Sequence, residues 1–73
     1  MLFIVKYSLE LENHFSTRSE KQTTFVKVLA ANHDEANEKV QDYYSLIPNY
    51  LSGNALKTYK YIAKQHSFDL ELN

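Results

Sequence analysis

The sequence predicts a single α+β domain in which a small antiparallel β-sheet packs one face against a helix. The residues from Leu2 to Glu12 alternate between apolar and polar, as a strand with one buried face does. The segment that follows Asn32 places apolar residues at helical spacing behind a helix-capping residue. A chain of 73 residues has room for one core, so we expect residues 1–73 to form one domain.

Two strands joined by a long loop are expected in the first thirty residues. In the first strand, Phe3, Val5 and Tyr7 share a face, and Lys6 and Ser8 belong to the opposite face. Residues 13–21 are polar and contain neither Gly nor Pro, which predicts a long hairpin loop instead of a two-residue turn. Residues 22–30 are rich in β-branched and aromatic side chains and predict the second strand.

A helix is expected to begin at Asn32. Its side chain can accept from a free backbone amide, and Glu35, three residues later, completes a capping-box pattern. One apolar stripe follows at helical spacing, formed by Ala36, Val40, Tyr43, Tyr44 and Ile47. Pro48 ends the helix, and residues 49–54 are expected to form a connector.

The structure of residues 55–66 is ambiguous in the sequence. The apolar residues of this segment fall on one arc of a helix, and this periodicity favours a second helix over a strand. Thr58, Tyr59, Tyr61 and Ile62 are equally compatible with a strand. Residues 67–72 alternate again and predict a short last strand. The element order is therefore β-β-α-α-β or β-β-α-β-β, with helix on one face of the sheet.

Composition argues against an enzyme and against a metal or cofactor site. The absence of cysteine excludes disulfides, thiolate metal ligands and a cysteine nucleophile. The three histidines, His14, His33 and His66, lack the spacing that places two ligands on one helix face. The single glycine rules out a glycine-rich phosphate loop. We therefore predict a non-enzymatic protein without catalytic residues, metal or cofactor.

The absence of cysteine fits a reducing cytoplasm, and the charge balance and the N-terminal run narrow the possible partners. Eight Lys and Arg against nine Asp and Glu give a net charge of −1, which predicts neither a broad nucleic-acid-binding field nor an acidic mimic of DNA. The apolar run at the N-terminus is interrupted by Lys6, too soon for a membrane span. We expect a cytoplasmic protein with no membrane partner.

The two predicted strands carry apolar residues on both faces near one end, and one helix layer covers only one face. The surplus apolar residues are Leu2, Ile4, Phe25 and Leu29. Either the chain's own C-terminal segment, a second copy or a foreign partner must cover them. Small domains without disulfide or metal often oligomerise, so we predict a homodimer whose interface contains these four residues.

Two further groups of residues are candidates for binding a larger partner. Phe15, an isolated aromatic within the polar loop, and Arg18 beside it suit an anchor and its polar rim. With Tyr59 and Tyr61 they form the predicted protein-binding site. The alternative is a nucleic-acid-binding surface, because Lys57, Lys60 and Lys64 would share one side of a helix interleaved with the same tyrosines.

The strand-to-helix junction resembles that of small phage-encoded accessory proteins, many of which bind and inhibit a host factor. The residues that carry the resemblance read T-F-V-K-V-L-A-A-N-H-D-E-A-N-E-K-V, followed by a C-terminal strand. The resemblance implies a compact module that inhibits a larger protein, for instance of host defence, by occupying its surface. It also implies that the protein acts in the host cytoplasm.

Overall fold

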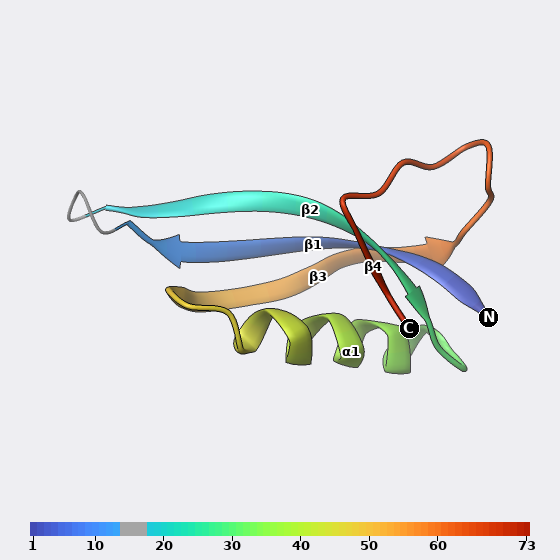
Figure 1. The fold of residues 1–73 in the computed structure, drawn as a ribbon, viewed down its shortest axis with the longest axis horizontal. Helices are drawn as coiled ribbons and strands as arrows, with labels where there is room; N and C mark the ends of the chain where they lie inside the picture. The colour runs from blue at the N-terminus through green and yellow to red at the C-terminus, as the bar shows by residue number, and fades with distance from the viewer. Residues whose placement is uncertain (14–17) are drawn as a thin grey trace.

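The protein is an α+β domain with one helix packed on one face of a four-stranded sheet (Figure 1). The computed structural model describes residues 1–13 and 18–73. The elements in chain order are β1 Leu2–Glu12, β2 Ser19–Leu29, α1 His33–Ser45, β3 Tyr50–Lys60 and β4 Leu70–Leu72. The predicted fold class is confirmed, in the β-β-α-β-β order.

The sheet has the strand order β3-β1-β2-β4, so the first strand of the chain occupies a central position. β1 pairs antiparallel with both β2 and β3, whereas β4 pairs parallel with β2. The expectation of a wholly antiparallel sheet is therefore wrong for β4. The reason is the long connection after β3, which returns the chain to the far edge of the sheet in the direction of β2.

The favoured helix over residues 55–66 is also wrong, because residues 50–60 form β3. Two β-bulges obscure the alternating pattern of this strand in the sequence. They lie at Leu51 and Leu56, which have no partner in the register with β1. Each bulge shifts the alternation by one residue. The two leucines are about half exposed, at 52% and 53%. The segment predicted as a connector, residues 49–54, largely belongs to the same strand.

The core lies between the helix and the face of the sheet that β1 presents to it. The buried residues are Phe3, Val5, Tyr7 and Leu9 of β1, Val26 and Val28 of β2, Ala30, and Ala36, Val40 and Tyr44 of α1. The ring of Tyr7 stacks on that of Tyr44 with centroids 5.3 Å apart. Its hydroxyl lies 3.2 Å from the hydroxyl of Tyr50. Burial, and then this hydrogen bond, raise the pKa of Tyr7 well above its ordinary value.

The helix begins where the sequence predicts. The Asn32 side chain accepts a hydrogen bond from the backbone N–H of Glu35 at 2.9 Å, which satisfies one of the free amides of the first turn. The Glu35 carboxylate lies 3.4 Å from Lys39 Nζ, one turn further along the helix. The helix ends at Ser45, and Asn49, with φ 71°, turns the chain into β3.

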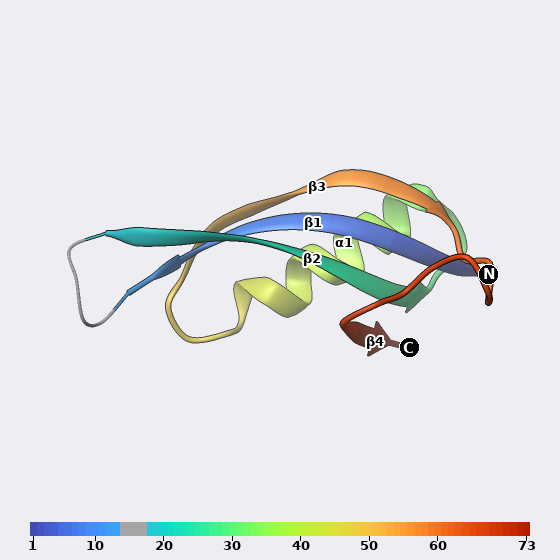
Figure 2. The ribbon, with the colours of Figure 1, turned by 90° about the horizontal axis from the view of Figure 1, so that it is seen from above.

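The connection between β3 and β4, residues 61–69, crosses the face of the sheet opposite the helix; we call it the crossing segment. Figure 1 shows the helix on one side of the strands and this segment on the other, and Figure 2 shows it passing across the end of the sheet near the N-terminus. The Tyr61 N–H donates to the Leu2 carbonyl at 3.1 Å, and the Asp69 N–H donates to the Phe25 carbonyl at 2.7 Å. The segment thus covers one end of this second face.

Candidate functional site

The face of the sheet turned away from the helix, which we call the open face, carries four rows of side chains. The pairing register defines each row from β3 through β1 to β2. The rows are Tyr59–Ile4–Lys27, Lys57–Lys6–Phe25, Asn54–Ser8–Thr23 and Ser52–Glu10–Lys21. Rows on one face of a sheet are about 7 Å apart, twice the rise per residue. The four rows therefore follow one another along the length of the strands, and we call this strip of side chains the track.

A hollow of about 480 Å³ lies on the open face beside the crossing segment. Its lining consists of two cations and three rings, from Lys6, Phe25, Lys57, Tyr59 and His66. We call it the lysine hollow. The rings of Tyr59 and His66 have centroids 4.7 Å apart, so the crossing segment contributes one wall. Side chains from three strands and one connection converge here although they are far apart in the sequence.

Lys6 and Lys57 are direct cross-strand neighbours in this hollow. Like charges placed directly opposite each other destabilise an antiparallel pair. Among residues 1–13 and 18–73, Lys27 and Lys39 form ion pairs with carboxylates. Within the same residues, neither Lys6 nor Lys57 forms an ion pair. Lys57 Nζ lies 5.6 Å from the centroid of the Tyr59 ring, a cation–π contact. The hollow is thus a locally positive site with aromatic walls.

A third cation of the open face, Lys27, already interacts with rings and a carboxylate of the protein itself. Its Nζ lies 4.4 Å from the centroid of the Tyr61 ring and 5.2 Å from that of Phe68. It also lies 3.7 Å from a carboxylate oxygen of Glu71. Lys27 therefore anchors the crossing segment and β4 to β2. This structural role separates it from the two lysines of the hollow.

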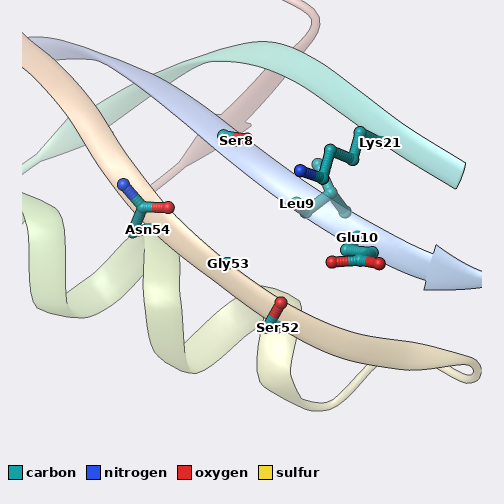
Figure 3. A pocket seen from close by; sticks show the side chains of 7 residues that line it. All are labelled: Ser8, Leu9, Glu10, Lys21, Ser52, Gly53 and Asn54. Atoms are coloured by element: carbon teal, nitrogen blue, oxygen red, sulfur yellow. The ribbon is translucent and has the colours of Figure 1, made fainter. Parts of the chain in front are cut away.

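Further along the track, towards the hairpin end of the sheet, lies a smaller hollow of about 140 Å³ (Figure 3). Its lining comes from Ser8, Leu9, Glu10, Lys21, Ser52, Gly53 and Asn54. Figure 3 shows Lys21 of β2, Glu10 of β1, and Ser52 and Asn54 of β3 around it. We call it the polar hollow, because it offers hydroxyl, amide, carboxylate and ammonium groups.

The structure brings together only part of the predicted protein-binding site. Tyr59 and Tyr61 both flank His66, with ring centroids 4.7 Å and 6.5 Å from the imidazole. Arg18 is exposed and precedes β2 at the hairpin end, the opposite end of the sheet from Tyr59. Phe15 lies outside the described residues. The four residues therefore do not form one cluster on the described part of the surface.

The predicted lysine stripe does not form, because it required a helix. In β3, Lys57 lies on the open face, and Lys60, which pairs with Phe3, lies on the helix-facing side. Lys64 lies in the turn of the crossing segment and is exposed. Of the three lysines, only Lys57 lines the lysine hollow.

Most of the residues predicted for the dimer interface are covered, fully or partly, by other parts of the same chain. Ile4 has no exposed surface and cannot contact a second copy, so its assignment to an interface is wrong. The crossing segment covers this end of the sheet, which is one of the alternatives that the sequence left open. Phe25 lines the lysine hollow, Leu2 is half-buried and Leu29 is 44% exposed. The homodimer itself stays a prediction.

The site has residues that sequence reasoning missed, namely Lys6 and His66. Lys6 was recognisable as the lone cation within an apolar run, but its neighbour Lys57 is 51 positions away and depends on a bulged register. Within the described residues, no group of three or more His, Asp or Glu side chains is placed to hold a metal ion. None of the helices of the described chain is long and apolar enough to cross a membrane.

No protein-family model matches the chain, and no curated protein or solved structure shows significant similarity to it. The resemblance to phage-encoded inhibitors therefore stays a prediction.

Proposed function

We propose that the protein is a small non-enzymatic module that binds a larger anionic partner on the open face of its sheet. The observation that carries the proposal is the placement of Lys6 directly opposite Lys57 in an aromatic-walled hollow. In the folded protein without a ligand, this repulsion lowers stability. An anion that binds between the two ammonium groups relieves the repulsion.

The surroundings of the pair support binding and give no support to catalysis. The hollow is lined by two lysines, an imidazole and two aromatic rings, and its lining includes no serine, threonine or cysteine that the imidazole could activate as a nucleophile. Its half-buried rings provide apolar contact area, which a partner can cover at low cost in side-chain entropy. The module would act by occupying its partner, as the protein-binding hypothesis also requires.

The experiment that tests the proposal measures the unfolding temperature in the presence of inorganic polyphosphate at low salt. A ligand that binds only the folded state stabilises it, so we expect a rise of about 5 °C or more near saturation. Lys6→Gln and Lys57→Gln should each lose most of this rise. Lys60→Gln, which removes the same charge from the other face of β3, is the matched control and should keep it. An equal loss in all three variants, or no rise at all, would contradict the proposal.

A further inference from the structure

We infer that the anionic partner is a single-stranded nucleic acid, whose phosphates meet Lys6 and Lys57 and whose bases stack on Phe25 and Tyr59. The inference rests on the proposed function and names the class of ligand for the same site. It follows from the placement of two aromatic rings around one pair of lysines on the open face.

The two rings lie on either side of the lysine pair. Phe25 is the β2 neighbour of Lys6 in the same row, and Tyr59 follows Lys57 in the next row of β3. All four line one hollow. A nucleic acid presents flat ring faces and phosphate charges in alternation, and base–aromatic stacking with backbone cations is how sequence-tolerant binding of single strands works. An acidic peptide without aromatic residues supplies the charges but not the flat faces.

A single strand fits this site better than a duplex. The rings of Phe25 and Tyr59 are partly buried in the face of the sheet, and a base must turn its own face to them to stack. In a duplex the base faces are already stacked on each other, so the protein can reach phosphates, sugars and base edges but no base face. The duplex would therefore contact the lysines without stacking a base on Phe25 or Tyr59.

The polar hollow extends the site, because it holds further nucleotides of the same strand. It begins at the row of Ser8, about 7 Å along the track from Lys6. Its serine hydroxyls and its Asn54 amide can donate to or accept from the edges of bases, and its Glu10 carboxylate can accept from them. The Glu10 carboxylate would be unfavourable beside a phosphate, so a base edge suits that side of the hollow, and the Lys21 ammonium suits a phosphate. An oligonucleotide that reaches both hollows should bind better than a mononucleotide.

The deciding experiment uses the unaltered protein and four fluorescent probes in anisotropy titrations at low salt. The probes are a mixed-sequence single-stranded octadeoxynucleotide, an abasic octamer with the same phosphates, the corresponding duplex, and octaglutamate. If bases stack on the two rings, the single strand should bind at least about five-fold more tightly than the abasic octamer. It should also bind more tightly than the duplex and octaglutamate, with an affinity that falls steeply as salt rises.

Ring variants test which residues stack the bases. Tyr59→Leu and Phe25→Leu should each weaken binding of the single strand by about five-fold or more and leave binding of the abasic octamer unchanged. Tyr43→Leu removes an exposed ring of the helix, remote from the open face, and is the matched control. Because the comparison with the abasic octamer uses the unaltered chain, the result does not depend on whether the variants fold.

The results distinguish failure of the inference from failure of the proposed function. Equal affinity for the abasic octamer and the single strand overturns stacking. Tighter binding of octaglutamate identifies an acidic protein as the partner and also overturns the inference, while the anion-binding function stands. If no probe binds and polyphosphate does not raise the unfolding temperature, both the inference and the function fail.

Discussion

Gly53 is the residue at which the packing of the sheet leaves no room for a side chain. A Cβ atom at this position would lie 2.6 Å from the hydroxyl oxygen of Tyr7, 2.7 Å from its ring and 2.9 Å from the carbonyl oxygen of Ser8. The Tyr7 ring cannot swing away freely, because it stacks on Tyr44 and its hydroxyl meets Tyr50. The only glycine in the chain is therefore required by a close approach, and not by its backbone conformation.

We predict that Gly53→Ala lowers the free energy of unfolding by about 1–3 kcal/mol, since overpacking forces neighbouring groups out of their preferred positions. Denaturant titration followed by circular dichroism measures the change. Ser52→Ala, at the exposed neighbouring position, is the control and should lie within about 0.5 kcal/mol of the unaltered protein. A Gly53→Ala variant as stable as this control would show that Tyr7 can move at little cost.

Buried tyrosines make the protein sensitive to alkaline pH. Burial raises the pKa of both Tyr7 and Tyr44 above the ordinary value of 10.0. Below pH 10 both states keep these protons, and the free energy of unfolding is independent of them. Above it the unfolded chain loses protons that the folded chain retains, so stability falls with rising pH, by at most about 1.4 kcal/mol per pH unit for each tyrosine.

Tyr7→Phe should therefore flatten the fall in stability above pH 10, although it also removes the hydrogen bond to Tyr50 and lowers stability at neutral pH by about 1 kcal/mol. Urea titrations at a series of pH values between neutrality and the alkaline limit give both quantities. An unchanged slope in the variant would mean that Tyr7 ionises equally well in the folded protein.

At the scale of elements, β4 depends on side-chain anchors because its own pairing with β2 is short. It contributes three residues to the sheet, and the crossing segment before it has few backbone hydrogen bonds to the strands. Lys27 compensates by contacting Tyr61 and Phe68 at the two ends of the segment and Glu71 in β4. The Asp69 carboxylate adds hydrogen bonds from the Phe25 N–H at 3.0 Å and the Thr24 hydroxyl at 3.2 Å.

We predict that Lys27→Met loosens β4 before it affects the rest of the sheet. A methionine fills a similar volume without the charge, so the cation–π contacts and the ion pair are lost. Hydrogen exchange should become faster at the amides of residues 61 and 69–72, while the amides shared by β1 and β2 stay protected. Lys60→Met, which lacks these contacts, is the control. Uniform loss of protection across the sheet would instead make β4 part of one cooperative unit.

The parts of the fold that follow local rules were predictable from the sequence, and those that depend on register were not. β1 and the Asn32 cap have the expected positions, because alternation and capping are local properties. β3 was hidden because its two bulges at Leu51 and Leu56 break the period of two. Over residues 55–60, bulged alternation matches a helical period by coincidence, and residues 61–66 belong to the crossing segment. The lysine hollow was unpredictable for the same reason, since Lys6 meets Lys57 only in this bulged register.

At the scale of the whole molecule, the open face limits the stability of the unbound protein. Lys6 and Lys57 repel each other across β1 and β3, and their repulsion is screened when salt is added. Sites prepared for a charged ligand commonly reduce stability in its absence, because the arrangement that binds is strained without the ligand.

We therefore predict that Lys6→Gln raises the free energy of unfolding at low salt by about 0.2–1 kcal/mol, although it weakens binding of polyphosphate. Adding sodium chloride should stabilise the unaltered protein more than this variant. Denaturant titrations at low and high salt test both statements, with Lys60→Gln as the control for a general charge effect. Lower stability of Lys6→Gln at low salt would show that the lysine stem packs more favourably than its charge repels.

The central place of β1 in the sheet also determines when during synthesis the site comes into existence. β1 is made first and can form its hairpin with β2 early, but its other neighbour, β3, begins only at Tyr50. Pairings between residues so far apart in the chain form late and slowly, because a large loop must close first. The lysine hollow needs β1, β2, β3 and the crossing segment together. The hollow therefore cannot form until β3 and the crossing segment have been synthesised, well after β1 and β2.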